Sequence, residues 1–339
     1  MSDNNQQHIV SVSPHTHEGS SVRRIMFDVI IALIPAAAVA VYLFGIDAVR
    51  LIAVCIISCV SLEYACRKAM GRDSGIGDLS AVVTGILIAF NLPPALPWWM
   101  AFIGCVFAIV IAKQLFGGLG YNPFNPALIG RVALTMSFPV AMTTWSKWQN
   151  SPVQTPVDAE TYATPLGLAK TGLQTAGKLP YEFDHSMAMD FFLGNMNGCI
   201  GEVSAAALIL GGIYLLIRRC ITWHIPVSYF GTVAFFSAIL WLADKGHNMP
   251  PFFHLLAGGL VLGSIYMATD MVTSPVTKKG MLVFGAGCGI LTMLIRKWGA
   301  FPEGVSFSIL LMNAVTPLIN RATKPRVFGT GKKGKTAQS

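Results

Sequence analysis

Charged side chains are scarce in this sequence, and their scarcity excludes an ordinary soluble domain. Of the 339 residues, 12% are charged and 53% are hydrophobic, whereas a soluble domain carries about 25% charged residues. The seven cysteines include no Cys-x-x-Cys pair, so we expect no iron–sulfur or zinc site built by this chain alone. A nicotinamide-binding glycine fingerprint is also missing, and chemistry of that kind would belong to another chain.

Long apolar runs, by contrast, recur along the whole sequence and indicate an integral membrane protein. We predict an all-α polytopic membrane protein with about ten transmembrane helices, in two five-helix repeats that cover residues 23–140 and 196–321. A long polar segment, residues 141–195, separates the repeats. The third, fifth and eighth spans are short or interrupted by Asn, Pro or Gly. The predicted spans are residues 25–44, 49–67, 78–91, 97–116, 123–140, 199–217, 223–243, 252–269, 280–297 and 304–320.

The distribution of basic residues predicts the orientation of the chain. Most of the 24 Lys and Arg fall on the side of the N-terminus, and such residues are enriched in cytoplasmic loops. We therefore expect a multi-pass protein of a bacterial inner membrane, with a polar cytoplasmic tail at 1–22 rather than a signal peptide. A basic cytoplasmic tail follows at 322–339, and residues 141–195 lie in the periplasm. These loops explain the net charge of +8, so no nucleic-acid partner is expected.

Similar motifs in the two halves predict an internal repeat. The first half reads GILIAFNLPPALP and later NPALIGR, and the second reads GSIYMATDMVTSPV and later NAVTPLINR. Because each half has five spans, the second half enters the membrane in the opposite direction. The breaks at Asn91–Pro97 and Ala268–Pro275 are then expected to line a central site, since non-helical backbone at membrane depth needs cover from protein or a cavity. The alternative is that these prolines only kink packed helices.

One threonine in the polar segment has two interpretations. Thr164 is followed by Pro165, and this order is typical of a helix start, because threonine is a good N-cap and proline is favoured at the first helical position. Gly167 stands where a capping box would need Glu or Gln. The other interpretation is that the hydroxyl is a chemical attachment point.

A pattern around this threonine carries a resemblance to a known family. The pattern D-x-x-T-x-A-T is formed by Asp158, Thr161, Ala163 and Thr164. It resembles the D-x-x-[ST]-[GS]-A-T signature at which a flavin transferase attaches FMN, although Tyr162 stands where Gly or Ser is usual. The stretches RVALTMSFP and EGVSFSILLMNAVTPLINR resemble the same family of membrane proteins. Together with the pattern around Thr164, they extend the resemblance over residues 20–325. That family comprises the D subunit of the Rnf ion-translocating electron transport complex and the B subunit of the sodium-translocating NADH:quinone reductase.

The resemblance implies a fold, cofactors and partners. The fold would be urea-transporter-like, with two inverted five-helix halves, and FMN would be joined to Thr164 by a phosphoester, with Asp158 helping to position the donor. A second, noncovalent flavin, riboflavin, would lie in the membrane domain. Partner subunits of the Rnf complex would move electrons between ferredoxin and NAD, coupled to sodium or proton translocation. The short N-terminal tail suits the Rnf protein more than its longer relative.

The sequence also supports rival interpretations. The inverted repeat with its two breaks is compatible with a urea-transporter-like channel or transporter for a small solute, and a silent assembly scaffold is a third possibility. Asp270 is either a functional group of the membrane interior or the cap of a half-helix. For Lys113, Arg131 and Arg296, we favour anchors that extend to the membrane interface, with pairing to a flavin phosphate or a lipid as the alternative.

Overall fold

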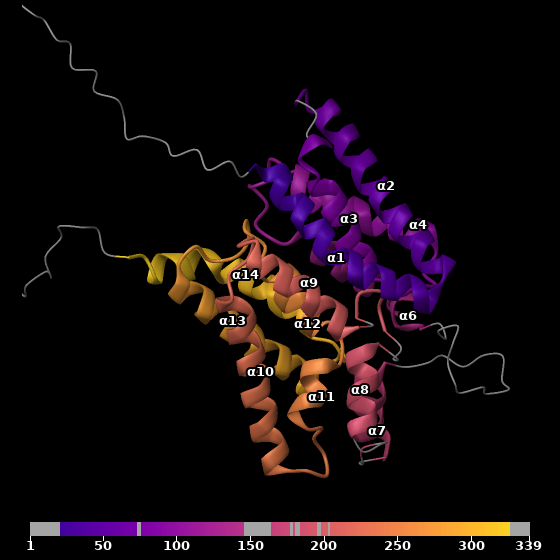
Figure 1. Ribbon diagram of the computed structural model, residues 1–339, viewed down its shortest axis with the longest axis vertical. Coiled ribbons are helices and arrows are strands. Elements are labelled where there is room, and N and C mark those ends of the chain that lie inside the picture. Colours follow the sequence, from indigo (N-terminus) through magenta and orange to yellow (C-terminus); the bar gives the residue numbers. More distant parts are fainter. Residues whose placement is uncertain are drawn as a thin grey trace, which may run out of the picture.

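The computed structural model describes residues 21–72, 76–145, 164–176, 179, 184–194, 198–202 and 204–325, and within these ranges it is helical without a sheet (Figure 1). The first half contains α1 (Val22–Phe44), α2 (Ile46–Ala69), the 3₁₀ turn η1 (Ile76–Asp78), α3 (Ser80–Phe90), α4 (Trp98–Val106), the π-helix η2 (Phe107–Gln114), α5 (Pro126–Ser137) and α6 (Pro139–Thr143). Two helices follow, α7 (Pro165–Ala176) and α8 (His185–Leu193). The second half contains α9 (Ala205–Ile217), α10 (His224–Ala243), α11 (Pro251–Leu256), α12 (Leu260–Leu262), the π-helix η3 (Gly263–Met267), α13 (Lys278–Trp298) and α14 (Val305–Ala322).

Five of the described helices are long and apolar enough to cross a membrane, namely α1, α2, α10, α13 and α14. Shorter apolar helices cover residues 80–90, 98–114 and 205–217. The outer faces of the long helices expose large apolar side chains, for example Tyr42, Ile57, Phe235 and Leu242. Such faces need a lipid environment, because soluble proteins rarely expose apolar surface continuously.

The interruptions predicted in the third, fifth and eighth spans are confirmed. Helix α3 has 11 residues and α5 has 12, and the eighth span is divided into α11, α12 and η3. Each of the ten predicted spans coincides with at least one helix. The number of membrane crossings and the inverted relation of the halves stay predictions.

The break after α3 is covered by a distant segment, residues 198–202. The amide of Gly201 donates to the carbonyl of Phe90 over 2.8 Å, and the amide of Ile200 donates to the carbonyl of Leu92 over 3.2 Å. These bonds satisfy carbonyls that the end of a helix leaves unpaired. A Cβ on Gly201 would lie 2.5 Å from the Cβ of Phe90, so only glycine allows this close approach.

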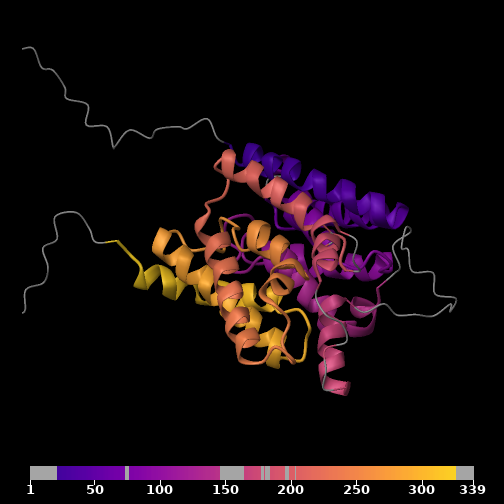
Figure 2. The same cartoon turned by 60° about the horizontal axis from the view of Figure 1, so that its bottom comes forward.

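Helices α1 and α9 lie side by side and join the two halves (Figures 1 and 2). A Cβ on Gly211 would lie 1.9 Å from the carbonyl oxygen of Ala32, so the glycine permits the close crossing. The hydroxyl of Tyr266, on η3, lies 3.2 Å from that same oxygen and 2.9 Å from the carbonyl oxygen of Leu208 on α9. The helices of the fifth and tenth predicted spans, α5 and α14, are also in contact.

The polar segment 141–195 was expected to be a loop, but its described part contains α7 and α8. These helices extend away from the bundle beside α11 (Figure 1). Apolar side chains of both helices form a small separate core with α11 and its flanking residues. The buried members of that core are Leu166, Ala169, Phe191, Met249, Phe253 and Ala257. Packing against this core explains why a segment of low overall hydrophobicity is helical.

Candidate functional site

Thr164 begins α7 as the sequence predicts. Its Oγ1 accepts a hydrogen bond from the amide of Gly167 over 3.1 Å, and its carbonyl accepts one from the amide of Leu168 over 2.8 Å. Pro165 is the first residue of the helix. Only 5% of Thr164 is exposed. The helix-start interpretation is confirmed, and the hydroxyl is held at a fixed position against the protein.

Thr164 lines a cavity of about 230 Å³ between α7, α5 and the start of α14. We call it the Thr164 cavity. Its polar lining combines hydroxyl groups with the Arg131 and Glu303 side chains, and its apolar lining is largely aromatic. Besides these residues, it is lined by Thr135, Trp145, Thr171, Phe301, Ser306 and Phe307.

Two aromatic rings give the Thr164 cavity a flat wall. The rings of Phe301 and Phe307 are stacked, with centroids 5.0 Å apart and planes inclined by 20°. Stacked or offset rings of this kind attract one another beyond simple burial. Trp145 adds a third aromatic side chain to the lining, and this one is buried. A planar, weakly polar ring system is the ligand that such a surface accommodates.

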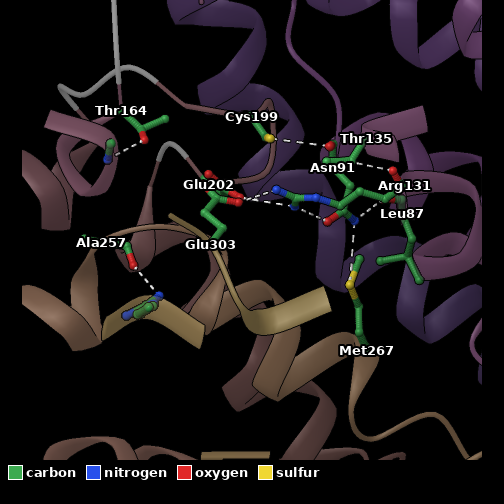
Figure 3. Close-up of polar contacts among 12 residues, drawn as sticks. Leu87, Asn91, Arg131, Thr135, Thr164, Cys199, Glu202, Ala257, Met267 and Glu303 are labelled. Carbon is green, nitrogen blue, oxygen red and sulfur yellow. Dashed lines mark hydrogen bonds and ion pairs between the residues drawn. The ribbon is translucent and has the colours of Figure 1, made fainter. Parts of the chain in front are cut away.

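At the inner end of the cavity, Arg131 joins three segments through a buried ionic cluster (Figure 3). Its Nη1 donates to Asn91 Oδ1 over 2.7 Å and to Glu202 Oε1 over 3.3 Å, and its Nη2 donates to Glu303. The amide of Asn91 in turn donates to the carbonyl of Leu87 over 2.6 Å. The cluster thus ties α5 to the break after α3, to the 198–202 segment and to the loop before α14.

In this cluster, the single guanidinium of Arg131 contacts two carboxylates, those of Glu202 and Glu303. Buried charges are stable only when they are paired and hydrogen-bonded, and Oε1 of Glu303 is buried without a hydrogen-bond partner among the described residues. Glu303 lines the Thr164 cavity. A ligand that donates a hydrogen bond, as the ring N–H of a flavin does, would satisfy this oxygen, so the residues present fit such a group.

Lys170 fixes α7 against the loop that carries Glu303. Its Nζ donates to the carbonyls of Gly299, over 2.5 Å, and Phe301, over 2.9 Å. Partial burial lowers the pKa of Lys170 below its usual 10.5, because burial disfavours the charged form. The threonine, the aromatic wall and the acidic cluster are thus held together by one side chain.

The other residues of the flavin-transfer pattern lie outside the described residues. These are Asp158, Thr161, Ala163 and the atypical Tyr162. Thr164 is therefore the one member of the pattern that the structure places, and the roles of the others stay predictions.

Asp270 lies in a different part of the molecule, at the break after η3. Its carboxylate accepts hydrogen bonds from the amide of Val272, over 3.3 Å, and from the hydroxyl of Thr273, over 3.2 Å, which are the contacts of a cap. It lines a cavity of about 120 Å³ together with Lys113 and the side chains of Asn122 and Asn125. That cavity does not include Thr164.

The prediction that Lys113, Arg131 and Arg296 extend to the membrane interface is wrong. Their exposed fractions are 2%, 9% and 5%. Each side chain is held by acceptors inside the protein. Lys113 Nζ pairs with Glu63 Oε2 over 2.8 Å, Arg131 pairs with two glutamates, and Arg296 binds backbone carbonyls.

Sequence reasoning did not single out Glu202 and Glu303. A signal was available, because both acids fall at the starts of predicted membrane spans, where ionisable residues are rare and usually paired. The partner could not be identified, since Arg131 is 71 positions from one glutamate and 172 from the other.

Comparisons with known proteins cover nearly the whole chain. The sequence model of the NQR2, RnfD, RnfE family matches residues 9–329. The D subunit of the Na(+)-translocating ferredoxin:NAD(+) oxidoreductase complex of Acetobacterium woodii is 46% identical over 97% of this chain and 98% of its own length. The D subunit of the proton-translocating ferredoxin:NAD(+) oxidoreductase complex of Clostridium ljungdahlii is 49% identical over 95% of this chain and 96% of its own. The D subunit of an ion-translocating oxidoreductase complex of Stutzerimonas stutzeri is 42% identical over 93% of this chain and 94% of its own.

Proposed function

Because the chain belongs to the NQR2, RnfD, RnfE family, we propose that it is the D subunit of an Rnf-type complex. The complex transfers electrons between ferredoxin and NAD and couples that transfer to the translocation of sodium or protons, the two ions for which the relatives are named. The chain is a multi-pass membrane protein and works with the other Rnf subunits.

Within this complex, Thr164 carries FMN through a phosphoester on Oγ1. The observation that supports this assignment is the Thr164 cavity itself, which brings together a nearly buried hydroxyl, a stacked aromatic wall and a carboxylate oxygen with no hydrogen-bond partner in the described part of the chain. Bound FMN would accept and release electrons singly or in pairs. Asp158, Thr161 and Ala163 belong to the sequence that the flavin transferase recognises.

The residues of this chain have three tasks at the site. The positive end of the α7 dipole stabilises negative charge at the position of Thr164, as helix N-termini do for phosphates. The Phe301 and Phe307 rings provide a flat surface, and Lys170 fixes the α7 helix to the loop at Gly299 and Phe301. Together they restrict the cofactor to one position at the end of the membrane domain.

The finer architecture is also part of the proposal. The halves comprise ten crossings in an inverted, urea-transporter-like repeat, with both termini in the cytoplasm. Two observations support the repeat. The third helical run is short or broken in each half, as α3 and as α11–α12–η3. The first helices of the halves, α1 and α9, are in contact, and so are those of the fifth and tenth predicted spans, α5 and α14. A second, noncovalent riboflavin lies in the membrane domain and would be released by denaturation.

The test is mass spectrometry of peptides from residues 150–180, after expression of the whole complex with the flavin transferase. We expect an added FMN on Thr164 and a fluorescent band on a denaturing gel. Thr164→Ala should abolish both signals, and Thr171→Ala, which removes another hydroxyl of the same cavity, should leave both unchanged. A colourless denatured wild-type chain would refute the covalent flavin and favour the solute-channel alternative.

A further inference from the structure

A second cavity lies on the other face of α7 and is lined by three cationic side chains. It has a volume of about 260 Å³ and is bordered by Lys170 from α7 and by Arg296 and Lys297 from the end of α13. We call it the cationic cavity. No Asp or Glu is among the residues that line it. Its remaining surface is mainly apolar and includes Leu166, Leu173, Leu240, Met249, Phe253 and Met293.

The three cations bind neutral acceptors within the described part of the chain. Arg296 donates to the carbonyls of His254, over 2.6 Å, and Ala257, over 3.0 Å. Lys297 donates to the side-chain amide oxygen of Asn248, and Lys170 donates to two carbonyls. None of the ion pairs formed by the described residues includes any of these three. They therefore form no direct ion pair with a described acid, although the carboxylates of Glu303 and Glu202 attract the Arg296 guanidinium at longer range.

Two buried nitrogen atoms at this cavity also lack partners within the residues that the structure describes. They are Nε of Arg296, whose residue is 5% exposed, and Nδ1 of His254. A buried charge without an opposite charge is unfavourable unless a ligand supplies one. Among the described acids, Glu303 pairs with Arg131, and Asp244 lies 2.8 Å from the ring of His247. The described residues therefore place no carboxylate in direct contact with the three cations, and an anion from outside the described part of the chain would fit the cavity.

The position of the cavity identifies the source of that anion. It lies where α10 and α13 end. Each of these helix ends carries a tryptophan in its sequence, Trp241 and Trp298, and tryptophans at helix ends mark the level of the lipid headgroups. Free phosphate would gain nothing from the apolar part of the lining, whereas a phospholipid matches both parts. Basic pockets between membrane helices bind anionic headgroups in this way. We propose that the cationic cavity binds the phosphodiester headgroup of an anionic phospholipid.

The proposal can be tested on the complex purified in detergent and stripped of lipid. Native mass spectrometry would measure the dissociation constants of short-chain phosphatidylglycerol, phosphatidylcholine and inorganic phosphate. Lys297→Gln and the double variant Lys170→Gln/Lys297→Gln reduce the charge without removing the buried Arg296. Lys245→Gln is the matched control, because Lys245 lies at the same helix ends but 4.9 Å from the centre of the Trp241 ring and outside the cavity lining.

We expect phosphatidylglycerol to bind more tightly than phosphatidylcholine. Lys297→Gln should weaken its binding about fivefold and the double variant roughly 25-fold, while Lys245→Gln leaves it unchanged. Equal binding of the two lipids would overturn the proposal, as would an equal loss in Lys245→Gln. If inorganic phosphate binds as tightly as phosphatidylglycerol and shows the same sensitivity to the variants, the site takes free phosphate and the lipid assignment is wrong. None of these readouts depends on the flavin.

Discussion

The two faces of α7 border cavities that differ in their charged side chains. On one face, the Thr164 cavity is lined by Arg131 and Glu303, which pair with each other, and Glu202 completes the ionic cluster. On the other, the cationic cavity is lined by Arg296, Lys170 and Lys297, and none of the described residues of its lining is acidic. The two arginines are almost equally buried, at 9% and 5% exposed, so it is their partners and not their burial that distinguish the two sites.

This difference shows how a buried arginine can serve two purposes. Arg131 is part of the protein's own ionic cluster and holds distant segments together. Arg296 satisfies carbonyls at the junction of α11 and α12 but leaves its charge available to a ligand. The comparison predicts that the first arginine matters mainly for stability and the second mainly for binding.

The largest effect is expected from removing the cation that faces two acids. Arg131→Met leaves Glu202 and Glu303 buried without a counter-charge, which should lower the free energy of unfolding by about 3–5 kcal/mol. Arg296→Met leaves only carbonyls unpaired and should cost about 1–3 kcal/mol. Denaturant titration of the purified complex, followed by helical circular dichroism, would compare them. Equal losses of unfolding free energy in the two variants would contradict the distinction between the two arginines. Partial recovery of stability when Glu303→Gln is added to Arg131→Met would support it.

A smaller effect is expected from displacing one acid without changing its charge. Gly201→Ala places a Cβ 2.5 Å from the Cβ of Phe90, beside Glu202, and such overpacking costs about 1–3 kcal/mol. Gly231→Ala is the control, because a Cβ there meets nothing within 4 Å and alanine is favoured in a helix by roughly 1 kcal/mol. Unfolding measurements that find the two variants equally stable would show that the 198–202 segment is free to move.

The aromatic wall should contribute less than the ionic cluster. Phe307→Leu removes the stacking with Phe301, which is worth about 0.5–1.5 kcal/mol. Phe235→Leu is the matched control, because Phe235 is 69% exposed on the outer face of α10. The difference between the two variants in unfolding free energy measures the stack. Emission of the attached flavin should change only in Phe307→Leu, and a change of equal size in Phe235→Leu would exclude a specific contact with the wall.

The smallest effect concerns the pH dependence contributed by Lys170. Burial lowers the pKa of its ammonium in the folded protein below 10.5, so the unfolded chain holds the proton to higher pH. The contribution of Lys170 to the free energy of unfolding therefore rises with pH between its lowered pKa in the folded protein and 10.5. The rise is small because the side chain is largely solvated. Lys170→Met should flatten the rise in melting temperature over that interval. An unchanged slope would mean that Lys170 titrates normally.

Several features of the fold could be predicted because their signals are local. Thr164 followed by Pro165 specifies a helix start, and the NLPP sequence specifies the end of α3. The apolar runs specify the membrane helices in the same way. The helix α8 and the length of α7 beyond its start were not predicted, since their stability comes from packing on α11 rather than from their own composition.

The ionic cluster could not be predicted, because its members are far apart in the sequence. Nothing around Arg131 indicates that Glu202 and Glu303 meet it, and the same holds for the grouping of Lys170 with Arg296. An isolated basic residue near a span end is usually an interface anchor, and that general rule gave the wrong result here because internal acceptors were close enough to hold the side chains.

The burial of Thr164 also constrains the order of events during biogenesis. A modifying enzyme has to surround the hydroxyl that it esterifies, yet this residue is 5% exposed and Lys170 fastens its helix to the loop at Gly299 and Phe301. If the nucleotide is attached at this position, esterification has to occur before α7 packs against the loop at Gly299 and Phe301. Lys170 would then hold the modified helix in place. A chain in which α7 packs before esterification would stay unmodified.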